Sequence, residues 1–94
     1  MFIGDLHITS GVMALIGDNI ITKQDVLKCV KRFINLDYGN LDSHDIGVND
    51  TNLNHNCGTV HGNYTINDNT IWIITTLSNN VEDVYSVVLL PEEY

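Results

Sequence analysis

Residues 70–77 constrain the fold of this chain more than any other part of the sequence. They read Thr-Ile-Trp-Ile-Ile-Thr-Thr-Leu, a run made almost wholly of β-branched and aromatic residues, and they contain the only tryptophan. Side chains of this kind pack well on a pleated sheet surface, so the run predicts a strand. Polar, turn-forming residues flank it at 67–69 and at 78–80. We therefore expect this segment to be the central strand of a sheet.

Two more strands are expected beside it. Residues 58–66 alternate with a period of two, so every second side chain falls on the same face. Residues 67–69 are Asn-Asp-Asn, which suits a hairpin because Asn and Asp tolerate positive φ. Residues 84–90 form the last predicted strand, which Pro91 ends. Three strands joined by short loops predict an antiparallel meander.

A fourth strand is expected at an edge of the sheet, in residues 2–8. With a period of two, Phe2, Leu6 and Ile8 share one face of this strand. Ile3 does not lie on that face.

Two short helices are indicated by their capping residues. Ser10 suits the N-cap of a helix over residues 11–16, which Gly and Asn residues then end. Asp42 or Ser43 suits the N-cap of a further helix that runs to about Asn52. The apolar content of this last segment is low, so an irregular loop is the alternative.

The clearest helix covers residues 22–35. Thr22 and Asp25 have the spacing of a capping box, and the basic residues near its end suit the helix dipole. One helical stripe is apolar: Val26, Leu27, Val30, Phe33 and Ile34. The sequence therefore predicts a single α+β domain, residues 1–94. We expect an antiparallel three- to four-stranded meander with two or three helices, the 22–35 helix packed on one face.

Charge is distributed very unevenly along the chain. Twelve acidic residues face four basic ones, for a net charge of −8. All four basic residues lie within residues 23–32, and residues 33–94 contain no Lys or Arg. Such a field repels nucleic acid and attracts basic surfaces, so direct nucleic-acid binding is disfavoured. The acidic side chains predicted to meet a partner are Asp37, Asp42, Asp45, Asp50, Glu82, Asp83, Glu92 and Glu93.

The sequence also predicts the cellular compartment of the protein. The first residues lack the basic start and apolar run of a signal peptide, and no apolar run is long enough to span a bilayer. Cys29 and Cys57 allow one disulfide at most, and Cys29 sits among apolar helix positions, where a buried thiol is common. We expect a cytoplasmic protein with reduced thiols, and no contact with a membrane.

Residues with metal-binding or nucleophilic chemistry gather in one region. His44, His55, Cys57 and His61 lie within eighteen residues, and His55, Cys57 and His61 are ligand types that zinc accepts. Their spacing matches no paired zinc signature, so solvated loop residues and a strand-face histidine are the simpler interpretation. Cys57 with a histidine would make a nucleophile pair, but no cation nearby stabilises its thiolate. Phosphate-binding glycine motifs are absent. We therefore predict no catalytic residue, no cofactor and no enzyme activity.

Five blocks of the chain recur elsewhere in this order and with similar spacing. They are Thr9-Ser10-Gly11, Leu36-Asp37-Tyr38-Gly39-Asn40, Asp45 with Asn49-Asp50, Ile71-Trp72-Ile73-Ile74-Thr75 and Leu89-Leu90-Pro91-Glu92-Glu93-Tyr94. In these blocks the chain resembles a family of small proteins from plasmids, phages and integrated elements, sometimes loosely attached to type I restriction systems. The resemblance implies a mobile-element origin and a compact α+β fold. It implies no catalytic residue.

The chain departs from that family at three places. Tyr38 stands where the family carries a tryptophan in the turn, and Thr76 stands where it carries an acid. An Asn-rich insert, residues 78–83, replaces an Asp-Arg pair. A role that depends on those residues is not transferred to this chain.

Charge and resemblance together predict an interaction protein. A small acidic product of a mobile element is expected to bind the basic nucleic-acid-binding surface of a host defence protein, such as a CRISPR effector or a restriction complex. Its carboxylates would replace phosphates there, as in an anti-CRISPR or anti-restriction DNA mimic. Three alternatives stay open. The acidity serves only solubility; the chain is a metal- or thiol-dependent enzyme using His55, Cys57 and His61; or it is an oligomeric accessory protein that assembles through strand edges.

Overall fold

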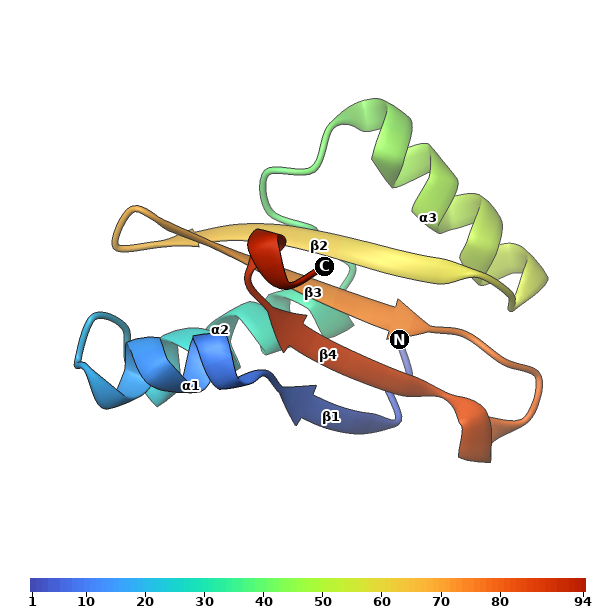
Figure 1. The fold of residues 1–94 in the computed structure, drawn as a ribbon. Helices are drawn as coiled ribbons and strands as arrows, with labels where there is room; N and C mark the ends of the chain where they lie inside the picture. Colours follow the sequence, from blue (N-terminus) through green and yellow to red (C-terminus); the bar gives the residue numbers. More distant parts are fainter.

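A four-stranded sheet with the strand order β1-β4-β3-β2 forms the centre of the computed structural model, which describes residues 1–94 (Figure 1). Three α-helices accompany the sheet, so the fold is α+β. In chain order the elements are β1 (Asp5–Ile8), α1 (Ser10–Gly17), α2 (Lys23–Ile34), α3 (Ser43–His55), β2 (Thr59–Ile66), β3 (Asn69–Thr76), the 3-10 helix η1 (Val81–Asp83), β4 (Tyr85–Leu89) and the 3-10 helix η2 (Pro91–Glu93). No helix combines the length and the apolar character needed to cross a membrane.

The strands β2, β3 and β4 form the predicted antiparallel meander, with β3 in the middle. Asn67 and Asp68 connect β2 to β3 and both have positive φ, as expected for a tight hairpin. The first strand differs from the prediction, because β1 pairs parallel to β4 and the sheet is therefore mixed. A strand of four residues whose partner lies far along the sequence carries no local signal of its direction.

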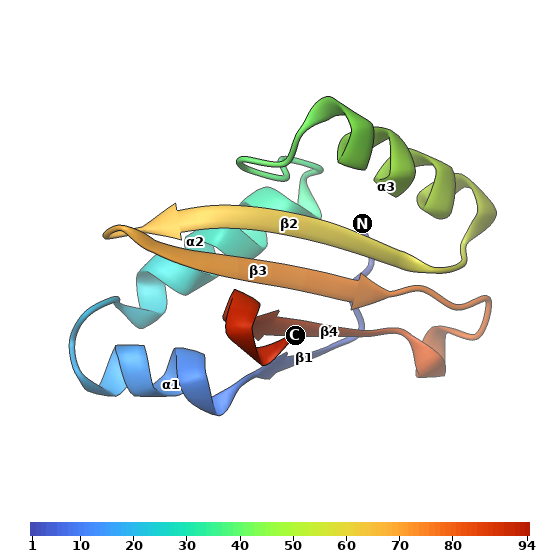
Figure 2. The same cartoon turned by 45° about the horizontal axis from the view of Figure 1, so that its top comes forward.

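The two faces of the sheet differ in what covers them. On one face, which we call the covered face, buried strand side chains join those of α1 and α2 in one apolar cluster. Figure 2 shows α2 behind β2 and β3, while the C-terminal turn lies in front of the sheet. The strand alternation places a second set of side chains on this front, or open, face: His61, Asn63, Trp72, Ile74, Val87 and Leu89.

Helix α2 confirms most of the predicted pattern. The capping box is present, since Thr22 and Asp25 exchange backbone-to-side-chain hydrogen bonds of 3.1 Å. The buried side chains of the helix are Val26, Cys29, Val30 and Phe33. Leu27 was predicted in this stripe but is 48% exposed. The buried face of the helix is centred on Val26, Cys29, Val30 and Phe33, and Leu27 lies beside it. The edge of the Phe33 ring packs against Tyr38 at 6.0 Å between centroids.

The N-terminal segment corrects two further predictions. Thr9, not Ser10, caps α1, with its hydroxyl accepting a hydrogen bond from the Val12 amide. Ile3 packs against the core, whereas Phe2 is 61% exposed. Gly4 explains this, because its φ of +60° breaks the alternation before β1 begins. A side chain at position 4 would collide with the Val84 carbonyl oxygen, so only glycine fits this turn.

The segment after Asp42, for which the sequence allowed a helix or a loop, is the helix α3. Asp42 is its N-cap, accepting a hydrogen bond of 2.8 Å from the Asp45 amide, and the helix continues three residues beyond the predicted end, to His55. Asn56 follows in the left-handed conformation. The helix buries only Asn49. Its low apolar content follows from its position, because it lies along the outer edge of β2 and packs against the sheet there (Figure 1).

Candidate functional site

Asparagine side chains attach α3 to the free edge of β2. The Asn49 amide accepts a hydrogen bond of 3.0 Å from the His61 N–H and donates one of 2.8 Å to the His61 carbonyl. It thereby bonds His61 as a neighbouring strand would. Asn52 donates to the Thr59 carbonyl at 2.8 Å, and Asn56 donates to the Ser78 carbonyl at 3.0 Å. Asn49 and Asn52 share one side of the helix, and Asn56 follows directly after its end. The helix is thus held in a fixed position beside the sheet.

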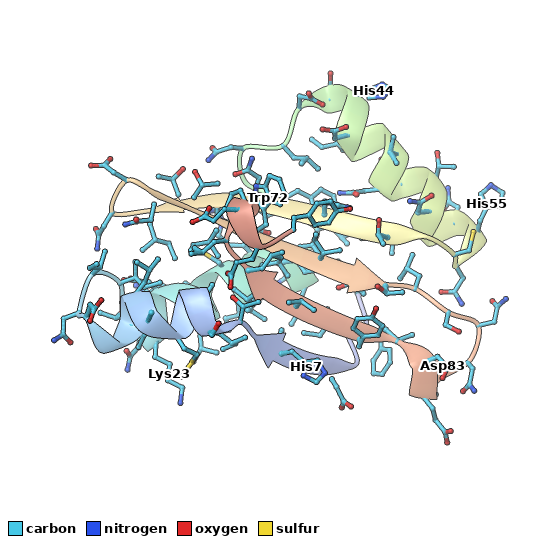
Figure 3. All side chains as sticks on the ribbon, viewed as in Figure 1. His7, Lys23, His44, His55, Trp72 and Asp83 are labelled. Carbon is cyan, nitrogen blue, oxygen red and sulfur yellow. The ribbon has the colours of Figure 1, made fainter.

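A cavity of about 350 Å³ lies between α3 and the open face. Residues from α3, from β2 and β3, and from the C-terminal turn surround it. Figure 3 shows Trp72 at the middle of the sheet, where the C-terminal turn crosses it. The lining residues are Leu41, Asp45, Val48, Asn49, Thr59, His61, Gly62, Asn63, Trp72 and Tyr94. We call this cavity the α3 pocket.

Three aromatic rings form walls of the α3 pocket. The Tyr94 ring lies 5.7 Å from the Trp72 ring and 6.2 Å from the His61 ring, between centroids. The interplanar angles are 73° and 66°, so both contacts are edge-to-face. Rings set at steep angles to one another present both edges and faces to the space between them.

The electrostatics of the pocket are those of an anionic site. Asp45 is its only acidic or basic side chain apart from His61, and its carboxylate accepts no hydrogen bond from the protein. Burial lowers the pKa of His61 below the ordinary histidine value, an effect that the nearby Asp45 carboxylate opposes. The neutral imidazole is therefore favoured at pH 7. The pocket combines neutral aromatic rings with one negative charge.

The pocket contains one pair of groups with acid–base chemistry, Thr59 and His61. The Thr59 hydroxyl and the His61 Nε2 lie 2.9 Å apart, which is a hydroxyl–imidazole pair. A nucleophile of that kind needs a third group that orients the imidazole, and no side chain hydrogen-bonds to the His61 Nδ1.

The eight acidic side chains predicted to meet a partner are all exposed, but they do not form one patch. Asp42 is the N-cap of α3, and Asp45 and Asp50 lie on the helix itself. Glu82 and Asp83 belong to η1. Figure 3 shows Asp83 on the opposite side of the sheet from the first turn of α3, which the label of His44 marks.

Besides Asp42, which caps α3, two of these acids have structural partners. Asp37 forms the only ion pair of the molecule, at 2.8 Å from Arg32, and this hydrogen bond lowers the pKa of Asp37. Glu93 accepts a hydrogen bond of 2.6 Å from the Thr9 hydroxyl, which lowers the pKa of Glu93. Glu93 also accepts hydrogen bonds from two backbone amides. Glu92, beside it in η2, is exposed. Asp37 and Glu93 thus have roles in the fold itself.

The histidine and cysteine residues are dispersed. His61 lines the α3 pocket, whereas His55 and Cys57 are exposed at the far end of α3. His44 and His55 lie at opposite ends of that helix (Figure 3). No three His, Cys, Asp or Glu side chains are placed to share a metal ion. Both cysteines are free, and burial raises the pKa of the Cys29 thiol.

Several pocket residues were not singled out as site residues from the sequence. Trp72 was assigned only to the central strand, and Asn49, Asn63 and Tyr94 were assigned no role in a site. One signal was available for Asn49, namely its spacing of three residues from Asn52, which puts both amides on one side of a helix. The meeting of Asp45, Trp72 and Tyr94 has no local signal, because each comes from a different element.

Comparisons with models of protein families, with curated proteins and with solved structures each gave no match. The resemblance to small mobile-element proteins accordingly stays an expectation.

Proposed function

We propose that this protein is a small acidic inhibitor, of mobile-element origin, that binds the basic nucleic-acid-binding surface of a host defence enzyme. A CRISPR effector or a restriction complex is the expected kind of target. Binding takes place in solution between two proteins and needs no cofactor. The inhibitor acts by occupying a surface that nucleic acid would otherwise reach.

One observation carries this proposal: the acidic side chains are exposed and nearly all lack a cationic partner. The chain has no Lys or Arg after Arg32, and all nine acids beyond that point are exposed. Only Asp37 among them is in an ion pair. The field of these carboxylates is therefore weakly compensated within the molecule, and it attracts a cationic surface over about a Debye length.

Helix α3 carries part of this acidic surface. Asp42 is its N-cap and Asp45 and Asp50 lie on the helix, which the amides of Asn49 and Asn52 hold against β2. Charges on a rigid support lose little conformational entropy on binding, which favours affinity. Asp37 and Glu93 are expected to contribute less to this surface, because Arg32 and Thr9 already hydrogen-bond to them.

The test is capture of purified CRISPR effectors and restriction complexes by the immobilised protein at low and at high salt. We expect capture at low salt, weakened capture at high salt, and competition by duplex DNA. The α3 variant Asp42→Asn/Asp45→Asn/Asp50→Asn should lose most of the binding. Asparagine keeps the N-cap at position 42, so the helix is expected to remain.

A matched control removes the same charge elsewhere. The variant Asp5→Asn/Asp18→Asn/Asp68→Asn changes three exposed carboxylates outside the predicted surface. It should retain binding. Equal loss in both triple variants would mean that net charge alone matters, and absence of any captured defence complex would contradict the proposal altogether.

A further inference from the structure

We propose that the α3 pocket holds the guanidinium group of an arginine side chain that the partner protein inserts. The choice of a protein arginine over a free guanidine rests on the proposed function. The preference for a guanidinium rests on three features of the pocket. It has aromatic walls, it contains a single carboxylate, and no Lys or Arg of this chain lies in it.

The aromatic walls suit a flat, weakly hydrated cation. Trp72 and Tyr94 meet at 5.7 Å and 73°, and His61 completes the wall at 6.2 Å from Tyr94. Rings at steep angles around one space form the arrangement that binds organic cations through their π faces. A guanidinium is planar and stacks on such rings, whereas an ammonium is a compact and strongly hydrated charge.

Polar groups in the pocket complement the same ligand. The Asp45 carboxylate accepts no hydrogen bond within the chain, and neither does the side-chain amide of Asn63. A guanidinium carries five N–H donors in a fixed fork that fits a carboxylate with two parallel bonds. Asp45 offers the two acceptors for that fork, and the Asn63 amide oxygen offers a third.

The chain contains one complete example of this chemistry. Arg32 donates two hydrogen bonds to Asp37, at 2.8 Å and 3.2 Å, while its guanidinium carbon lies 5.1 Å from the centre of the Tyr64 ring. A carboxylate and an aromatic ring thus hold a guanidinium on α2. The α3 pocket presents the same two groups without a guanidinium.

The occupant has to come from outside the chain. All four Lys and Arg residues belong to α2, on the covered side of the sheet, and Arg32 is already engaged by Asp37. The pocket is on the open face, and residues 33–94 have no cation to place there. A nucleic-acid-binding surface is rich in arginine, so it supplies the complementary group.

Trp72 makes the proposal directly measurable. It is the only tryptophan, so intrinsic tryptophan fluorescence reports on the pocket alone. The probe is N-acetylarginine amide, titrated into the purified protein and compared with N-acetylcitrulline amide, its uncharged isostere. We expect a saturable change with the arginine probe, at a dissociation constant of about 1 mM, and at least tenfold weaker binding of the citrulline probe.

Two variants of equal charge separate the pocket from the general field. Asp45→Asn should weaken binding of the arginine probe about tenfold, since a charge-assisted hydrogen bond is lost. Asp18→Asn makes the same charge change at the end of α1, outside the pocket lining and outside the proposed acidic surface, and should alter binding less than twofold. Circular dichroism checks that both variants remain folded.

Three outcomes overturn the assignment. They are no saturable change with the arginine probe, equal binding of the citrulline probe, and equal effects of Asp45→Asn and Asp18→Asn. Failure of the proposed function gives a different result, because the arginine probe then binds while no defence complex is captured. Conversely, capture of a defence complex that survives Asp45→Asn unchanged contradicts the pocket assignment and leaves the inhibitor proposal standing.

Discussion

His61 is the residue at which helix, sheet and pocket meet. Its backbone is bonded by Asn49, its ring contacts Thr59 and Tyr94, and its carbonyl and amide lie at the free edge of β2. Because burial lowers the pKa of His61, the folded protein holds this proton less tightly than the unfolded chain. The stability of the fold is therefore linked to pH at this one residue.

The sign of that linkage is fixed by the direction of the shift. Between the ordinary histidine value of about 6.5 and the lower folded value, the unfolded chain binds more protons, so acidification favours unfolding. We expect the free energy of unfolding, measured with urea, to be at its full value above about pH 6.5 and to fall as the pH drops through the folded pKa.

His61→Gln is the variant that isolates this effect, since glutamine keeps a polar partner for Thr59. Its unfolding free energy should vary less than that of the unchanged protein between neutral pH and about pH 5. The hydrogen-bonded carboxylates Asp37 and Glu93 add losses only at more acidic pH, because their pKa values are lowered. An NMR titration that puts the His61 pKa above the ordinary histidine value would contradict the prediction.

At the scale of single elements, α3 is attached to the edge of β2 by asparagine amides. Most helices pack against a sheet through a stripe of apolar side chains. Asn49 is 2% exposed and makes two hydrogen bonds to the β2 edge. Asn49→Leu keeps the approximate volume but leaves the His61 N–H and carbonyl without partners. We expect a loss of about 2–3 kcal/mol in unfolding free energy, together with faster hydrogen exchange of the His61 amide.

The matched control is Asn54→Leu, on an exposed position of the same helix. Its stability should stay within about 0.5 kcal/mol of the unchanged protein. If the two leucine variants are equally stable, the amide bonds to the β2 edge contribute nothing to stability and α3 is held by other contacts.

Elements with local signals were the ones that the sequence predicted well. The β-branched run became β3, the Thr22 and Asp25 pair became a capping box, and the Asn67-Asp68 turn closed the hairpin. Each of these depends on residues close together in the chain. The sequence did not distinguish a helix from a loop at α3. Hydrophobic periodicity indicates a helix only where apolar side chains are buried, and this helix packs through amide side chains.

Non-local features were the ones that could not be predicted. The parallel pairing of β1 with β4 joins residues 5–8 to residues 85–88, and no pattern in either segment records the other. The α3 pocket is a further case, because its carboxylate, its tryptophan and its tyrosine meet only after the sheet has formed. The acids were predicted as one surface, yet the fold distributes them over α3, η1 and η2.

At the scale of the whole molecule, the charge imbalance is expected to reduce stability. A net charge of −8 is spread over a body with principal extents of 39 × 29 × 22 Å, and one ion pair offsets it. Many like charges therefore lie within about two Debye lengths at 0.1 M salt. Added NaCl should screen this repulsion and raise the melting temperature by about 4–8 °C, if the gain is about 1 kcal/mol.

The control for this prediction is again Asp5→Asn/Asp18→Asn/Asp68→Asn, which lowers the net charge without touching α3. It should melt at a higher temperature than the unchanged protein at low salt, and should respond less to NaCl. A melting temperature that falls or stays constant with NaCl would show that self-repulsion is not a significant term.

The two edges of the sheet also differ at this scale. The edge of β2 is closed by α3 and by residues 38–40, whose backbone bonds to Asn63 at 3.0 Å and 2.7 Å. The outer edge of β1 has no neighbour in the sheet. Assembly through strand edges, the accessory-protein alternative, therefore has only the four residues of β1 available, and a short edge strand is a weak template.

The pairing of β1 with β4 has a consequence for synthesis of the protein. The first strand emerges early from the ribosome, but its partner is made only after the hairpin of β2 and β3. During translation the chain therefore carries an unpaired strand, with Leu6 and Ile8 not yet packed in their final positions. The sheet is therefore complete only once β4 has been made, and until then the unpaired β1 is open to chaperones and proteases.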